Sequence, residues 1–281
     1  MIAYNLGGNA FFCAWHALLT ITQSALAIRY QTWGFSFAMC CGTILEVLGY
    51  VARILQHHGE DAFVMDVVCI TIAPAFFSAA VYLSLARIVT VYGERFSRIK
   101  QRTYTITFMI ADFVCLLLQA SGGGTTQSDD PEVRDTGLRL IQAGLAAHLA
   151  AMTAFIVLAT DFGWHTRKGR GGWNPDFAHL HQSRLWKRYL IALTTGTVCI
   201  WIRTAFRVVE LSQGFSSTIA QNEPAFFVLE SSMILIGATA LTVLHPGLGF
   251  RGRWTNANFT LRGTKVKESR GQLVELRSQK P

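Results

Sequence analysis

The sequence predicts an all-α, polytopic membrane protein: a seven-transmembrane helix bundle with its N-terminus outside and its C-terminus in the cytosol. Of its 281 residues, 51% are hydrophobic and only 15% are charged, whereas soluble domains carry about 25% charged residues. Seven apolar stretches reach the roughly 20 residues that a helix needs to cross a bilayer. The net charge is +8, but the basic residues lie between these stretches, which argues against a nucleic-acid partner.

The boundaries of the spans follow from the polar and Gly- or Pro-containing segments between them. The predicted spans cover about residues 9–29, 33–55, 66–88, 104–121, 138–160, 188–209 and 223–245. Gly122-Gly123-Gly124 is expected to end the fourth span and Pro246-Gly247 the seventh. Pro74 lies inside the third span and predicts a kink that neighbouring helices must satisfy. Residues 1–248 then form the membrane domain, and residues 249–281 form a basic tail expected to be disordered.

The distribution of basic residues predicts the orientation. Of the 25 Lys and Arg residues, 20 lie at Arg29, in segments 87–102 and 161–188, and in the tail 249–281. Cytoplasmic loops carry the excess of Lys and Arg, so these segments are expected to be cytosolic. The acidic loop 122–137 then lies outside. The basic tail is expected to contact anionic lipid of the inner leaflet.

Polar side chains inside the spans are the candidate functional residues, because charges in the hydrocarbon layer are costly and usually mark a pathway or a site. Several of them share one helix face through spacings of three, four or seven residues. The candidate substrate pathway or intramembrane polar network consists of Glu46, Tyr50, Arg53, Asp112, Gln119, Gln142, His148, Arg203, Arg207, Glu210 and Glu230.

These residues come from five helices, and most are expected at a similar depth in the outer half of the membrane, which suggests one constellation. Arg203 and Arg207 need carboxylate partners there, and the candidates are Glu46, Glu210 and Glu230. Glu46 and Arg207 are the leading candidates for ligand contact, because each lies deepest with an opposite charge available. The alternative is a purely structural cluster whose ion pairs fix the register of the helices.

The same polar residues belong to strings that carry a family resemblance, in order, from the second span to the end of the seventh. The strings are Glu46-x-x-Gly49-Tyr50-x-x-Arg53, Ala73-Pro74 followed by Ala79-Ala80-x-Tyr82, Asp112 with Gln119-x-x-Gly122-Gly123, Gly144-Leu145, Arg203-x-x-Phe206-Arg207-x-x-Glu210-x-x-x-Gly214, Glu223, and His245-Pro246-Gly247. With them the sequence resembles the fungal lipid-translocating exporter family. Two positions depart from the family's tendency: His148 stands where Gln is usual, and Phe227-x-x-Glu230 stands where Tyr-x-x-Asp is usual.

The resemblance implies a fungal source and a protein that translocates or exports lipid-like amphipathic molecules. These would be sphingoid bases, phospholipids or sterol-like toxins, and the protein would confer resistance to them. Membrane lipids or lipophilic small molecules are then its partners, and the plasma membrane is its expected location, with an endomembrane as the alternative. We expect no enzymatic activity, no cofactor and no metal. The oligomeric state stays open.

Two other functions remain open. A lipid-sensing receptor with seven helices fits the same architecture and orientation. An intramembrane lipid hydrolase would need three protein ligands that converge on one zinc ion. The histidines at the spans, His16, His148 and His245, are expected at different depths, which argues against the hydrolase.

Overall fold

The computed structural model describes residues 5–126, 128–212, 223–252, 254–255 and 257. All regular structure in these ranges is helical, and seven helices are long and apolar enough to cross a membrane. The first six are α1 (Leu6–Tyr30), α2 (Trp33–His57), α3 (Phe63–Tyr92), α4 (Gln101–Thr125), α5 (Pro131–Lys168) and α7 (Arg184–Ser212). The seventh consists of α8 (Glu223–Phe226), a π-helical turn η4 (Phe227–Ser231), α9 (Ser232–Val243) and α10 (Pro246–Gly249). The predicted all-α bundle of seven membrane-spanning helices is confirmed.

Short helical turns connect the long helices at one end of the bundle. They are η1 (Glu94–Phe96) between α3 and α4, then η2 (Arg170–Gly172), η3 (Pro175–Phe177) and α6 (Ala178–His181) between α5 and α7. Each of the first six predicted spans lies inside one observed helix, and α5 extends well beyond its predicted span at both ends. Asp130 caps the start of α5 by accepting a hydrogen bond from the backbone of Glu132, and Pro131 occupies the first turn.

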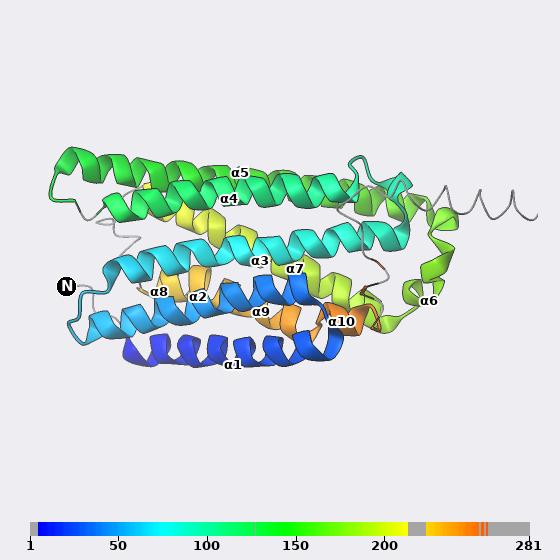
Figure 1. Cartoon of the computed structure of the whole chain (residues 1–281), viewed down its shortest axis with the longest axis horizontal. Helices are drawn as coiled ribbons and strands as arrows, with labels where there is room; N and C mark the ends of the chain where they lie inside the picture. Colours follow the sequence, from blue (N-terminus) through cyan, green and yellow to red (C-terminus); the bar gives the residue numbers. More distant parts are fainter. Residues whose placement is uncertain (1–4, 127, 213–222, 253, 256, 258–281) are drawn as a thin grey trace, which may run out of the picture.

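Helix α3 lies at the centre of the bundle (Figure 1) and packs against α2, α4, α5 and α7. Its hydropathy is the highest of the seven candidate spans, and 61% of its most apolar window is buried. A helix that is apolar on all sides is suited to a buried position. Helices α4 and α5 lie on one side of α3, and α1 and α2 lie on the other side (Figure 1).

The described parts of the predicted basic segments lie at the same end of the bundle. This end holds the turn from α1 to α2, the connection through η1, α6 and α10 (Figure 1). The first described residues after α10 cover it, since Phe250, Trp254 and Ala257 are buried. Arg87 donates a 2.6 Å hydrogen bond to the Trp254 carbonyl and lies 3.8 Å over its ring. The rest of the predicted tail lies outside the described residues.

Close packing between α4 and α5 depends on glycine. Helix α4 continues through Gly122-Gly123-Gly124 and ends at Thr125, so the predicted helix stop was placed a few residues too early. A Cβ atom on Gly122 would lie 2.5 Å from the carbonyl oxygen of Gly137 and 2.9 Å from the backbone nitrogen of Ile141. Small residues allow two membrane helices to approach this closely.

We therefore expect Gly122→Ala to lower the thermal unfolding midpoint of the detergent-purified protein. Forcing a methyl group into a packed interface typically costs about 1–3 kcal/mol. Gly124→Ala is the matched control, because no heavy atom lies within 4 Å of a Cβ at that position. Its midpoint should stay unchanged or rise slightly, since Ala is the better helix former. Equal midpoints for the two variants would contradict this account of the α4–α5 contact.

Candidate functional site

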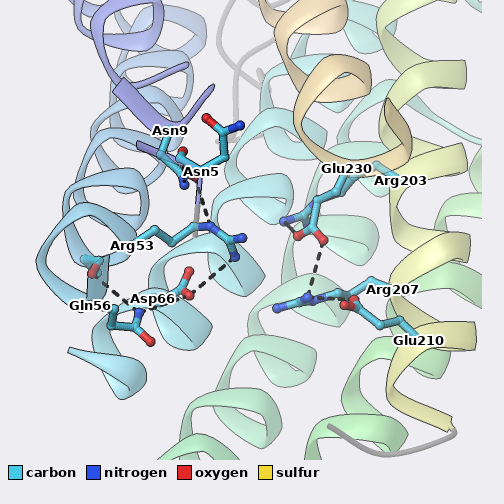
Figure 2. A network of polar contacts seen from close by, with 10 residues as sticks. Asn5, Asn9, Arg53, Gln56, Asp66, Arg203, Arg207, Glu210 and Glu230 are labelled. Carbon is cyan, nitrogen blue, oxygen red and sulfur yellow. Dashed lines mark hydrogen bonds and ion pairs between the residues drawn. The ribbon is translucent and has the colours of Figure 1, made fainter. Parts of the chain in front are cut away.

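The centre of the candidate site is a cluster of buried ion pairs between α7 and the seventh span. Arg203 and Arg207 lie about one turn apart on α7, and both are buried. Arg203 forms an ion pair of 3.0 Å with Glu230. Arg207 lies 3.3 Å from Glu230 and 2.7 Å from Glu210 (Figure 2). Glu230 therefore bridges the two arginines, and two of the three predicted carboxylate candidates are their partners.

A proline in α3 supplies another acceptor for the same cluster. Pro74 has no backbone N–H, so the carbonyl of Ile70, four residues earlier, loses its helical hydrogen bond. The Nη2 atom of Arg203 donates a hydrogen bond to this carbonyl. The expected requirement that a neighbouring helix satisfies the proline site is thus met by α7.

Glu230 occupies an irregular part of the seventh span. The π-helical turn η4 contains it, and Glu230 and Ser231 are both buried there. The hydroxyl of Ser232 donates a 2.7 Å hydrogen bond to the carbonyl of Phe227 at the start of this turn. Single π-helical turns inside α-helices occur frequently at functional sites. The turn is a local departure from the α-helix at the residue that bridges the two arginines.

A second group of polar contacts lies nearby on α1, α2 and α3 (Figure 2). The Nε atom of Arg53 donates a 3.1 Å hydrogen bond to Asn9, and its Nη1 atom lies 3.5 Å from a carboxylate oxygen of Asp66. Asp66 also accepts a hydrogen bond of 3.3 Å from Gln56. The guanidinium of Arg53 lies 3.8 Å over the ring of Phe226. Asn9 and Asp66 were missed because each is the first residue of a predicted span, where a polar side chain is ordinary.

Glu46 on α2 is buried with 1% exposure, and its Oε1 atom has no hydrogen-bond partner among the described residues. The charged groups that act on it most strongly are Arg203, Glu230, Arg207 and Asp66. Glu46 thus lies near both groups of polar contacts, although no ion pair within 4.0 Å joins it to a described residue. Glu46 was one of the three predicted carboxylate partners of the α7 arginines. In the structure, Glu230 and Glu210 form these ion pairs instead.

Tyr50 lies one turn after Glu46 on α2 and is also buried. Its ring stacks on Phe12 at a centroid distance of 5.5 Å and on His16 at 5.9 Å. The ring of Phe227 stacks on Phe12 as well, at a centroid distance of 5.6 Å. An apolar, aromatic surface therefore borders the polar residues of α2.

The other predicted residues lie elsewhere, so the expected single constellation is divided. Gln142 of α5 donates a 2.6 Å hydrogen bond to the carbonyl of Leu211 at the end of α7. Gln119 lies between α4 and α5, where a Cβ atom on Gly144 would be 2.8 Å from its Cγ atom. Asp112 and His148 form a separate buried pair between α4 and α5.

The two carboxylates Glu230 and Glu46 should respond differently to neutralisation. Glu230→Gln leaves two buried guanidinium groups without their shared partner, and breaking a buried ion pair costs about 3–5 kcal/mol. Glu46→Gln replaces a buried carboxyl group whose Oε1 atom has no hydrogen-bond partner among the described residues, so stability should be unchanged or higher. Thermal unfolding of the two purified variants measures this. A loss of stability in Glu46→Gln as large as that in Glu230→Gln would show that Glu46 belongs to the ion-pair network.

Comparison with known proteins identifies the family. The family described as RTA1-like protein matches residues 39–253, a range that includes every candidate residue from Glu46 to Glu230. The chain is 34% identical over 278 residues to the sphingoid long-chain base transporter RSB1 of Saccharomyces cerevisiae (strain Lalvin EC1118 / Prise de mousse), with 88% of this chain and 72% of the relative covered. It is 28% identical over 234 residues to Protein RTM1 of Saccharomyces cerevisiae, with 80% and 73% covered.

No solved structure gives a significant match. The family match and the two yeast relatives confirm the resemblance that the sequence strings indicated. The seven helices and these relatives also establish the chain as an integral, multi-pass membrane protein. The chain belongs to the RTA1-like protein family.

Proposed function

We propose that this protein moves cationic lipid-like amphiphiles, with sphingoid long-chain bases as the leading class, across the membrane and so confers resistance to them. Relatives named as sphingoid long-chain base transporters support this proposal. The observation that carries it is Glu46, which is buried beside the ion-pair network and whose Oε1 atom has no hydrogen-bond partner among the described residues.

The charges around Glu46 favour a cationic ligand. In the described part of the chain, three arginines of this region face four carboxylates, namely Arg53, Arg203 and Arg207 against Glu46, Asp66, Glu210 and Glu230. When all seven groups are ionised, one more positive charge neutralises the set, and a buried charge without compensation is costly. A long-chain base carries a single cationic amine. A phospholipid phosphate would instead add a negative charge where the arginines already have carboxylate partners.

The surroundings of Glu46 also suit the rest of such a molecule. The aromatic surface of Phe12, Tyr50 and Phe227 lies beside the carboxylate-bearing face of α2. Helix α1 is only 28% buried in its apolar window, and it exposes large apolar side chains such as Phe11 and Leu18. An amine at Glu46 is then held next to apolar surface, so the hydrocarbon chain stays in a lipid-like environment while the protein replaces the water around the headgroup.

Glu46→Gln is therefore expected to reduce protein-dependent movement of a fluorescent long-chain base in reconstituted vesicles by about tenfold or more, since a lost interaction of about 1.4 kcal/mol corresponds to a factor of ten. Cells that express the variant should also lose resistance to added long-chain base. Glu60→Gln, which changes an exposed carboxylate after the same helix, is the matched control and should behave as the wild type.

Movement and resistance that persist in Glu46→Gln at normal expression would refute the role of Glu46. Wild-type protein that binds the base in a charge-dependent manner without moving it would replace the transporter proposal with the receptor alternative.

We further propose that the protein lies in the plasma membrane and that the basic end of its bundle faces the cytosol. This end holds a hollow lined by Arg29, Tyr30, Gln31, Arg251, Gly252 and Thr255. Neither arginine forms an ion pair within the described residues. Both are exposed there, as expected for side chains that meet anionic lipid headgroups of the inner leaflet.

Cysteine labelling tests this orientation. Asp129, between α4 and α5, and Gln182, directly after α6, are both exposed. The α4–α5 connection and α6 lie at opposite ends of the bundle (Figure 1). In intact cells, a membrane-impermeant maleimide should label Asp129→Cys and leave Gln182→Cys unlabelled until the membrane is permeabilised. The unmodified chain, with its six free cysteines, gives the background signal. The opposite labelling pattern would reverse the proposed topology.

A further inference from the structure

A second buried ionisable pair lies on the other side of α3 from Glu46. The Nδ1 atom of His148 on α5 lies 2.9 Å from an oxygen of Asp112 on α4, and the two side chains are 4% and 5% exposed. The remaining polar atoms, Nε2 of His148 and Oδ2 of Asp112, are buried without a hydrogen-bond partner among the described residues. Buried polar atoms without partners are uncommon in native proteins and need an explanation.

Among the residues that the structure describes, no Lys or Arg forms an ion pair with this Asp112–His148 pair. The titratable groups that face Asp112 are Tyr82 from α3, Cys115 from α4 itself and His148 from α5. Within the described chain, no Lys or Arg lies within ion-pair distance of Asp112. The network around Glu46 differs, because its positive charges are guanidinium groups that stay protonated in proteins. Among the described residues, a proton on His148 is thus the counter-charge that lies within ion-pair distance of Asp112.

From these contacts we propose that Asp112 and His148 form a proton-binding site, and that the protein exchanges a cationic lipid for a proton. This inference rests on the proposed function and adds its energy source. Each of the two sites then lacks one positive charge from the protein: Glu46 receives it from the lipid amine, and Asp112 receives it from the proton carried by His148.

Helix α3 connects the two sites. Before Pro74, the carbonyl of Ile70 accepts a hydrogen bond from Arg203. After Pro74, the hydroxyl of Ser78 donates a 3.3 Å hydrogen bond to the sulfur of Met152, one turn after His148 on α5. The two halves of α3 therefore contact different helices, α7 before the proline and α5 one turn from His148 after it, and the proline between them is the kind of position where a helix bends.

The exchange balances charge. Binding of one monovalent amine at Glu46 adds one positive charge to the buried bundle, and loss of the proton from the imidazole of His148 removes one. When the amine leaves Glu46, the imidazole takes up a proton again. At no stage does the bundle bury an additional net charge, which would be costly in the membrane.

The experiment uses the full-length protein in phosphatidylcholine vesicles with a fluorescent N,N,N-trimethylated long-chain base as the probe. A quaternary ammonium group carries no exchangeable proton, so a proton flux that depends on both probe and protein passes through the protein. A pH-sensitive dye inside the vesicles reports this flux. A gradient of one pH unit supplies about 1.4 kcal/mol, so wild-type protein should accumulate the probe up to about tenfold, and a proton–potassium exchanger should abolish the effect.

Asp112→Asn and His148→Gln retain polar side chains of similar size, but the amide groups do not exchange a proton as a carboxylate–imidazole pair can. Both variants should still equilibrate the probe across the membrane, without accumulation in the gradient and without proton flux. His58→Gln, which changes an exposed histidine in the turn after α2, is the matched control and should accumulate the probe as the wild type does.

The outcomes separate this inference from the proposed function. Wild-type protein that moves the probe but ignores the pH gradient refutes proton exchange and leaves lipid transport intact. Full accumulation by His148→Gln refutes the assignment of the proton site, and a lower unfolding midpoint in that variant then identifies the pair as a structural clamp between α4 and α5. Wild-type protein that moves neither the trimethylated probe nor an unmodified long-chain base overturns both proposals.

Discussion

The ion pair between Arg203 and Glu230 is the interaction on which this half of the bundle depends. It joins α7 to the seventh span, and the same guanidinium satisfies the Ile70 carbonyl that Pro74 leaves free on α3. Three helices thus meet at one buried cation. Removing that cation would leave a buried carboxylate and a buried carbonyl unpaired at once, and each carries a substantial desolvation cost. The position of the neighbouring carboxylates follows from this fixed charge.

Most of the fold could be predicted from sequence, because the length and hydropathy of a membrane helix are dictated by the bilayer. The ends of α5 show where this reasoning stops. The first turns of α5 contain Arg134, Asp135 and Arg139, and hydropathy excludes much of this stretch from a span. The helix nevertheless begins at Pro131, because the Asp130 cap and the proline start it independently of the membrane. Hydropathy therefore locates the buried part of a helix better than its ends.

The candidate site was predictable in part for the same reason. The cost of buried charge identifies Arg203, Arg207 and the carboxylates near them as residues that need partners. The choice of partner depends on how helices rotate about their axes and on the π-helical turn that contains Glu230, and neither follows from spacing along one helix. For the same reason, spacing alone does not place Asp112 and His148 on the opposite side of α3 from Glu46. The resulting separation gives the protein two polar sites in place of the expected one.

The two sites differ in the source of their positive charge, and this difference bears on what each can bind. Guanidinium groups remain charged at all physiological pH values, so the network of Arg203 and Arg207 holds a constant charge and its carboxylates stay occupied. Among the described residues, Glu46 has no such partner at its Oε1 atom, and Asp112 forms its ion pair with the imidazole of His148 and not with a guanidinium group. A carboxylate that is permanently paired with a guanidinium group does not exchange this partner for another cation. A carboxylate without such a partner can bind a mobile cation and release it again. The fixed ion pairs hold the helices together, and the two carboxylates that lack them are the positions where the bundle can take up and release charge.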